Sequence, residues 1–327
     1  MVDISIVIVN YKSWNDLKDC LQSIITINSS KFTMETIVVD NQSNDGRLEE
    51  FKTLFPSILF IENSGNNGFA NGCNVGSSYA KGNYLFFLNP DTTVTEEAVF
   101  ELWKTAATNE KIGIVCCTQV NESNNKYNEI RFFPSLTNLF GPLRAWYRWS
   151  NKRAIVKNYS PEKQIIFPDW ATGAVIFMSR SWLERINGWT EKYWLYFEDV
   201  DICKKVNLMG GKIALIRNTF IIHKHGGASR INIKTKALTK TEVLISQHVY
   251  FNEHTEGFKN YCIQVLLVFT NLIEKTLLAL IGIIFFFIPK LKVNVLILSR
   301  LIQYYISSII NRTWTSPRAM DYVYKQN

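Results

Sequence analysis

The chain has few cysteines and none at the spacing of a metal-binding or redox pair. Its six cysteines are scattered over 327 residues without a CxxC motif. Cys20, Cys116, Cys117 and Cys203 lie in apolar-patterned segments, as reduced core cysteines of cytosolic proteins do. We therefore expect neither a disulfide framework nor a cysteine-stapled secreted domain.

Other signals are also missing. No Ser-His-Asp arrangement or nucleophile elbow is visible, so a hydrolase is a poor interpretation. No internal repeat or low-complexity segment is present. The strand-like run Ile4–Val9 has no basic segment and no cleavable apolar segment before it, so we do not expect secretion.

The charge is divided unequally along the chain. Residues 1–203 hold 19 Lys and Arg against 23 Asp and Glu, whereas residues 204–327 hold 17 against 5. The acidic N-terminal part and the basic, apolar C-terminal part favour a soluble domain that is attached to an anionic surface. The basic residues flank apolar runs and no nucleic-acid motif is present, so we expect no nucleic-acid partner.

The first half alternates short β-branched runs with segments of helical periodicity. This rhythm predicts an α/β fold, with a mostly parallel sheet covered by helices on both faces. Thr95 is the expected N-cap of one helix. The predicted strands are 4–9, 36–39, 58–61, 84–88, 112–117, 174–178, 212–216 and 219–223, with helices at 14–28, 71–80, 179–186 and 199–209.

Two later regions depart from this rhythm. Residues 121–165 are irregular and rich in aromatics, and we expect a surface excursion with one helix near 136–151. From about residue 260 the chain turns apolar, but the unbroken run 276–288 is shorter than the about 20 residues of a spanning helix. Two interpretations stay open, a monotopic or re-entrant membrane anchor and a helical pair packed on the domain.

An acidic segment stands out at the predicted start of the last helix before residue 210. Glu198, Asp199 and Asp201 fall within four positions, behind the aromatics Trp189, Tyr193 and Trp194. Carboxylates at a helix start can simply complement the helix dipole. Next to aromatics, they also fit a site that holds a base or a cation beside a ring-shaped substrate.

Polar loops follow the predicted parallel strands, at the ends where such sheets bind ligands. Asp40 is placed to accept from a nucleobase and Asp91 to hold a divalent cation, although either residue can simply form a turn. The loops contain no Arg-rich phosphate clamp, which favours a diphosphate neutralised by a metal ion. The loops are residues 10–12, 40–46, 63–70 and 89–91.

Seven segments between residues 5 and 229, taken in their order along the chain, resemble the motifs of glycosyltransferase family 2. They are most similar to its bacterial rhamnosyltransferase-like branch. The resemblance covers residues 3–230 and implies a GT-A fold, a nucleotide-diphosphate sugar donor, Mg²⁺ or Mn²⁺, and inversion at the anomeric carbon. The resemblance predicts a catalytic domain at 1–235, and the apolar, basic composition of the remaining chain predicts a C-terminal helical, membrane-associating region at 236–327. The matching segments are 5–11, 38–46, 66–76, 88–91, 170–174, 198–203 and 223–229.

The resemblance also assigns roles to individual residues. Asp199 matches the catalytic base, Asp40 the base-contacting aspartate and Asp91 the last carboxylate of the metal-binding DxD. His225 matches the histidine that reaches the metal or diphosphate, with His223 as the alternative. The first DxD position is Asn89, which removes one negative charge. Donor binding is further expected from Asn10, Tyr11, Asn66, Gly68 and Asn89, and the sugar and acceptor pocket from Trp170, Gly173, Ala174, Trp194 and Glu198.

These observations predict an enzyme that transfers a sugar to a lipid-linked oligosaccharide in O-antigen, capsule or cell-wall assembly. The resemblance alone makes dTDP-rhamnose the preferred donor. The expected location is the cytoplasmic face of the bacterial inner membrane, with the membrane surface as a partner. A UDP-hexose donor and a soluble acceptor are alternatives. A non-catalytic nucleotide-sugar-binding scaffold is a third possibility, since such folds can lose their chemistry.

Overall fold

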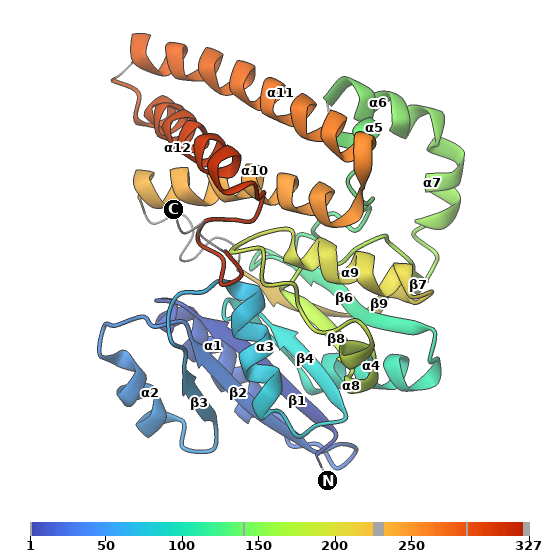
Figure 1. Cartoon of the computed structure of the whole chain (residues 1–327). Coiled ribbons are helices and arrows are strands. Elements are labelled where there is room, and N and C mark those ends of the chain that lie inside the picture. Colours follow the sequence, from blue (N-terminus) through green and yellow to red (C-terminus); the bar gives the residue numbers. More distant parts are fainter. Residues whose placement is uncertain (1, 140, 225–231, 286, 323–327) are drawn as a thin grey trace. The chain divides into compact units, whose positions relative to one another are not determined.

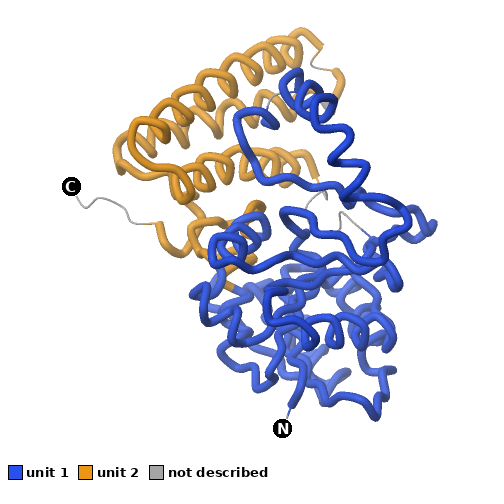
Figure 2. The backbone as a smooth tube through the Cα atoms, turned by 90° about the vertical axis from the view of Figure 1, so that its right-hand side faces the viewer, with its two compact units in different colours: residues 1–66, 72–189, 199–225 blue, residues 67–71, 190–198, 226–327 orange. Residues whose placement is uncertain are grey.

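The computed structural model describes residues 2–139, 141–224, 232–285 and 287–322. The chain forms two compact units. Unit 1 comprises residues 1–66, 72–189 and 199–225, and unit 2 comprises residues 67–71, 190–198 and 226–327 (Figure 2). Two short internal segments thus group with the C-terminal helices, and the predicted boundary after residue 235 stays a prediction.

Unit 1 is built on a nine-stranded sheet with the order β3-β2-β1-β4-β8-β6-β9-β5, and β7 pairs with β9 (Figure 1). Its inner strands are apolar and buried on both faces, as the continuous hydrophobic runs require. The strands are β1 (Ile4–Asn10), β2 (Met34–Asp40), β3 (Leu59–Glu62), β4 (Tyr84–Leu88), β5 (Thr92–Thr93), β6 (Ile112–Val120), β7 (Ile165–Ile166), β8 (Val175–Ser179) and β9 (Lys212–His223).

The strands β3, β2, β1 and β4 are parallel, as the alternating pattern predicts. Strand β8 then enters antiparallel between β4 and β6, so the whole sheet is mixed. The two strands expected at 212–216 and 219–223 form one strand, β9. A register shift against β6 separates Ile216 from Phe220, which accounts for the apparent break in the pattern.

Helices α1, α3, α8 and α9 begin and end within three residues of the predicted positions, whereas α2 was not predicted. Thr95 caps α4 as expected, because its hydroxyl oxygen accepts from the N–H of Ala98 at 3.2 Å. Helices α5 and α6 lie where a helix was expected near 136–151, and α7 follows them without having been predicted. The helices are α1 (Trp14–Ile25), α2 (Arg47–Leu54), α3 (Phe69–Tyr79), α4 (Glu96–Thr108), α5 (Leu136–Leu139), α6 (Gly141–Ser150), α7 (Lys152–Asn158), α8 (Arg180–Arg185) and α9 (Glu198–Leu208).

Unit 2 contains three long helices, α10 (Ile233–His254), α11 (Gly257–Ile284) and α12 (Pro289–Asn311), and α11 and α12 run side by side (Figure 1). By length and composition, residues 257–284 and 291–311 could each cross a membrane. Only 22% and 33% of their most apolar windows are buried. A core helix of a soluble protein would be mostly buried, so these two helices present unusually large apolar surfaces.

Candidate active site

Asp91 lies beside a histidine of the neighbouring strand in unit 1. Its Oδ1 is 3.2 Å from Nε2 of His223, and both side chains are largely buried. His223 Nδ1 lies 3.0 Å from Oε1 of Gln119, and Gln119 Nε2 donates to the hydroxyl of Thr172 at 2.7 Å. Because an amide oxygen only accepts, Nδ1 of His223 is the donor in this pair, and its Nε2 faces Asp91. The ring orientation is thus fixed by the protein.

Asp199 is joined to the same framework through the residues next to Thr172. Its Oδ2 accepts from the N–H of Gly173 at 3.0 Å, and its Oδ1 accepts from the N–H of Val200 at 2.8 Å. The next carbonyl, that of Ala174, accepts from the N–H of Asn89 at 3.1 Å. Hydrogen bonds therefore join the predicted base, Asp199, to the predicted pocket segment 173–174, and that segment to Asn89 at the first DxD position.

The surroundings of Asp199 favour a proton acceptor that titrates above the ordinary range. Burial raises the pKa of the Asp199 carboxyl, while the N–H groups of Gly173 and Val200 and the charge of Arg131 oppose that rise. The Arg131 guanidinium stacks on the ring of Trp170 at 4.6 Å. Trp170 in turn donates from Nε1 to the carbonyl of Phe132 at 3.0 Å. Asp199 thus sits beside a cation and an aromatic ring.

The ends of β1 and β2 are tied together by side chains. Asp40 Oδ1 accepts from Nδ2 of Asn10 at 2.8 Å and from the hydroxyl of Ser43 at 2.6 Å, and its Oδ2 accepts from the N–H of Ser43 at 2.8 Å. These bonds shape the two loops. Tyr11 follows as an exposed ring, and Asn66 lies partly buried in the loop after β3.

Within unit 2, the predicted glycine of the donor loop lies against a predicted pocket residue. Gly68 has φ +97°, and a Cβ there would fall 2.3 Å from the carbonyl oxygen of Trp194. That carbonyl accepts from the N–H of Phe69 at 3.2 Å, and Arg318 lies 5.4 Å from the Trp194 ring. Only glycine fits this approach.

The segment before the acidic cluster has an unusual backbone. Tyr196 and Phe197 have φ values of 71° and 68°, a left-handed conformation that is costly for bulky residues. Glu198, the next residue, is buried at the start of α9, where a carboxylate complements the helix dipole. Tyr193 is also fully buried, so this aromatic belongs to the core.

Several residues near this site were not predicted. Gln119 and Thr172 connect His223 to the Gly173 segment, and Arg131 lies between Asp199 and Trp170. No motif marks them, although Arg131 does precede an aromatic pair in the irregular region. His225 lies outside the described residues.

The Asp91–His223 pair fits two ligands of a divalent cation. Their separation of 3.2 Å is close to the roughly 3 Å between neighbouring ligands of an octahedral ion with bonds of about 2.1 Å. A partner on the second ring nitrogen, as Gln119 provides, is the usual support of a metal-binding histidine. Among the described residues no group of three or more His, Cys, Asp or Glu clusters, so water and substrate oxygens would complete the set.

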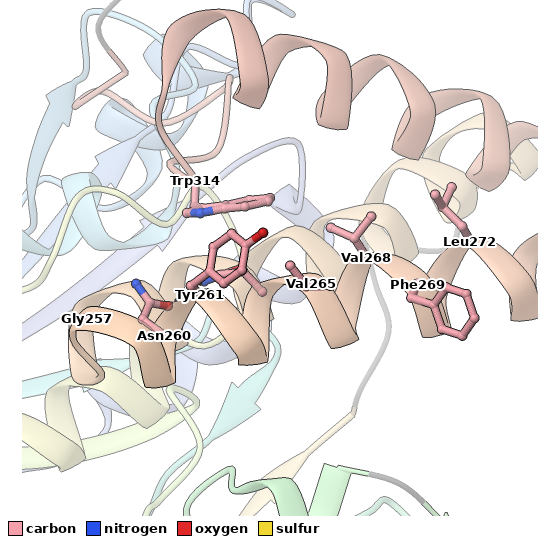
Figure 3. Close-up of a pocket in the computed structure, with 9 residues that line it drawn as sticks. Gly257, Asn260, Tyr261, Val265, Val268, Phe269, Leu272 and Trp314 are labelled. Atoms are coloured by element: carbon pink, nitrogen blue, oxygen red, sulfur yellow. Dashed lines mark hydrogen bonds between the residues drawn. The ribbon is translucent and has the colours of Figure 1, made fainter.

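A separate apolar groove of about 520 Å³ lies along α11 in unit 2. Tyr261, Val265, Val268 and Phe269 line it from α11, and the ring of Trp314 closes one end (Figure 3). None of the predicted site residues that the structure describes lines this groove. Its lining is mostly apolar.

Sequence comparison relates the chain to sugar-transferring enzymes. A hexosyltransferase of low-salt glycan biosynthesis, Agl10 of Haloferax volcanii, is 26% identical over 62% of this chain and 60% of its own length. Rhamnosyltransferase WbbL of Escherichia coli is 23% identical over 67% and 82%. N-acetylglucosaminyl-diphospho-decaprenol L-rhamnosyltransferase of Mycobacterium tuberculosis is 20% identical over 67% and 75%. The chain thus spans about three-fifths of the first of these relatives.

Solved structures share the fold. GalNAc-T7 with UDP, GalNAc and Mn²⁺ superposes with a TM-score of 0.53 at 17% identity, over 68% of this chain and 43% of that one. The mannosyltransferase PcManGT of Pyrobaculum calidifontis, in complex with GDP-Man and Mn²⁺, gives 0.52 at 14% identity, over 79% and 66%. The predicted GT-A fold is confirmed. Residues 5–179, more than half of the chain, match the family described as glycosyl transferase family 2, and the chain therefore belongs to that family.

Proposed function

We propose that this chain is an inverting glycosyltransferase that moves a sugar from a nucleotide-diphosphate donor to a hydroxyl group of a lipid-linked oligosaccharide. The observation that carries the proposal is a continuous set of contacts from Asp91 to Asp199. Asp91 lies 3.2 Å from His223, and hydrogen bonds continue from His223 through Gln119 to Thr172, next to the Gly173 N–H that binds Asp199. It supports a site in which Asp91 serves the diphosphate of the donor at one end and Asp199 serves the acceptor hydroxyl at the other.

Asp199 acts as the general base of the reaction. The acceptor hydroxyl oxygen forms a bond to the anomeric carbon, the bond from that carbon to the diphosphate oxygen breaks, and the diphosphate leaves with the electron pair. The hydroxyl proton passes to the Asp199 carboxylate. The N–H groups of Gly173 and Val200 hold both carboxylate oxygens, so the base is oriented before the acceptor arrives.

Asp91 and His223 would hold the divalent cation, Mg²⁺ or Mn²⁺. When bound, the cation neutralises negative charge on the diphosphate. Asn89 at the first DxD position supplies an amide in place of a second carboxylate, so the chain contributes little charge to the cation. Gln119 keeps the His223 ring turned toward Asp91. His225, whose position is outside the described residues, is the further candidate ligand.

The donor nucleotide binds at the strand ends. Asn10 and Asp40 shape the loops after β1 and β2, and the remaining acceptor capacity of Asp40 serves the nucleobase. Trp170 contributes aromatic surface for a sugar ring. L-Rhamnose from dTDP-rhamnose is the preferred donor, because two of the related enzymes are named rhamnosyltransferases.

The acceptor is membrane-linked, and the enzyme works at the cytoplasmic face of the bacterial inner membrane. The large apolar surfaces of α11 and α12 and the groove in Figure 3 support an apolar partner. The excess of basic residues after residue 203 supports an anionic surface beside it. The name of the mycobacterial relative gives a lipid-linked diphosphate sugar as that enzyme's acceptor.

Thermal shift of the full-length protein with a panel of nucleotide sugars, with and without Mn²⁺, tests the donor and the cation together. We expect dTDP-rhamnose to raise Tm more than UDP-hexoses do, and to do so more strongly with Mn²⁺. Asp91→Ala and His223→Ala should each lose the Mn²⁺-dependent part, with about tenfold or greater weakening of cation binding. Glu110→Ala, an exposed carboxylate of the same unit, is the matched control.

A larger rise in Tm with a UDP-hexose would change the donor that we assign but not the class of enzyme. If no nucleotide sugar stabilises the protein with or without the metal, the proposal fails. Binding without any product from a lipid-linked acceptor would instead favour the scaffold.

A further inference from the structure

Helices α6 and α7 carry an exposed and purely basic surface on unit 1. Residues 141–158 contain five Lys or Arg and no Asp or Glu. All five side chains are exposed, and within the described part of the chain none of them forms an ion pair. Such a surface attracts a polyanion. The five are Arg144, Arg148, Lys152, Arg153 and Lys157.

The same helices expose large apolar side chains. Trp146 and Trp149 are 57% and 75% exposed, and α6 buries none of its described residues. Helical spacing places these two indoles on one face and the guanidinium groups of Arg144 and Arg148 on another. Tryptophans that face solvent in a folded protein mark a surface that is covered in use.

A third face fastens α6 to the catalytic unit. The ring of Tyr147 packs edge-on against Phe132 at 5.5 Å, and Phe132 also contacts Tyr159 at 6.2 Å. The carbonyl of Phe132 accepts from Trp170, whose ring stacks on Arg131. The basic, aromatic surface is therefore connected by direct contacts to the residues beside Asp199.

We propose that α6 and α7 form an interfacial binding surface for a bilayer of anionic lipids. Trp146, Trp149 and Leu143 enter the boundary between headgroups and acyl chains, and the five cations contact the lipid phosphates. The separation of indoles and guanidinium groups on different faces fits a layered interface. Single-stranded nucleic acid would instead need aromatic rings and cations lining one groove.

Lipid binding by this surface does not depend on sugar transfer. Its consequence for catalysis rests on the proposed function. A lipid-linked acceptor presents its sugars close to the lipid headgroups. Tyr147 and Trp170 both contact Phe132, so a helix bound at the headgroups holds the Trp170 side of the proposed pocket near the acceptor sugars.

Hydrogen exchange of the full-length protein tests the proposal without any substitution. The chain is reconstituted with phosphatidylcholine, alone or mixed with phosphatidylglycerol. We expect amides of residues 141–158 to exchange about tenfold or more slowly with the anionic mixture, since each cation near such a surface adds about 1 kcal/mol. Equal exchange in both mixtures overturns the proposal, because α11 and α12 are present in each.

Two variants locate the binding. Trp146→Ser with Trp149→Ser, and Arg144→Glu with Arg148→Glu, should each abolish the protection by anionic lipid. Lys104→Glu with Lys111→Glu makes the same charge change elsewhere on unit 1, and Tyr79→Ser removes another exposed ring; both should leave the protection intact. Protection that survives in the tryptophan variant, or that an oligonucleotide gives and lipid does not, contradicts a lipid surface.

Transfer to a water-soluble acceptor without lipid separates this proposal from the function. The α6 variants should transfer at the wild-type rate under those conditions. If the wild-type protein shows lipid protection but no transfer, the proposed function fails and the lipid surface stands.

Discussion

At the residue scale, the proposed function makes Asp199 the base that deprotonates the acceptor alcohol. Burial raises the pKa of its carboxyl, and two backbone N–H groups and the Arg131 charge keep the ionised form accessible. A base must be deprotonated before it can act. If Asp199 is the proposed base, the environment of its carboxyl sets the lower limit of the working pH range.

The transfer rate should fall with decreasing pH at a higher pH than an ordinary aspartate would cause. Because the pKa of Asp199 is raised, its carboxyl is protonated, and unable to accept a proton, at pH values where an exposed aspartate is still ionised. A profile of kcat/KM against pH, with circular dichroism over the same range as the folding control, measures this. An acid limb at the usual value of about 4 would contradict the raised pKa.

Gln119 is predicted to act through His223. Gln119→Leu removes the bonds to His223 and Thr172, so the imidazole is no longer held toward Asp91. We expect Mn²⁺ affinity in the presence of nucleotide to fall by about 10- to 100-fold, as for other supports of metal ligands. Calorimetric titration of Mn²⁺ measures it. Gln164→Leu, the same change at an exposed position of unit 1, should have no effect; equal losses would mean that Gln119 is merely structural.

The motif residues were predictable because their chemistry and order are visible in the sequence. Asp199, Gly173 and Asn89 were assigned to one site, and the hydrogen bonds are consistent with that assignment. Gln119 and Arg131 were missed, because a glutamine in an apolar strand and an arginine in an irregular loop gain meaning only from tertiary contacts. Asp40 was assigned to the nucleobase, but its bonds to Asn10 and Ser43 could not be read from the motif.

At the scale of elements, the loop before α3 depends on a close backbone approach. Gly68→Ala should destabilise the protein more than Gly46→Ala does. Both glycines have positive φ, which costs an alanine about 1–2 kcal/mol, but only at Gly68 does the added Cβ meet a backbone oxygen, that of Trp194. Urea unfolding compares the two free energies of unfolding. Equal losses would show that conformation alone, and no packing against Trp194, requires glycine there.

The periodicity of the sequence predicted whether a segment is a helix or a strand more reliably than it predicted where that element begins and ends. Helix α4 starts where Thr95 predicted, because a side-chain cap is a local signal. The helix predicted near 136–151 is present as α5 and α6, but its amphipathic surface, with Trp146 and Trp149 exposed, was not anticipated. Helical spacing was visible in that segment, but which face would pack on Phe132 depended on the fold.

At the scale of the whole molecule, the chain combines a catalytic unit with helices of large apolar surface. Phe269→Glu with Leu277→Glu should shift the expressed full-length protein from the membrane fraction to the soluble fraction. A charge on a membrane-embedded helix costs about 2.5–3.5 kcal/mol, whereas an exposed position in water costs about 0.5 kcal/mol or less. Leu208→Glu on α9 is the control, since that residue is similarly exposed on unit 1. Unchanged partition would instead support a helical pair in water.

The most direct measurement of the central claim is sugar transfer by full-length Asp199→Asn with a saturating donor. Asparagine keeps the shape but cannot accept the proton, so transfer should fall by about 10²- to 10⁴-fold while donor affinity stays near that of the wild type. Transfer at an undiminished rate would show that another group deprotonates the acceptor, and it would contradict the account of this site.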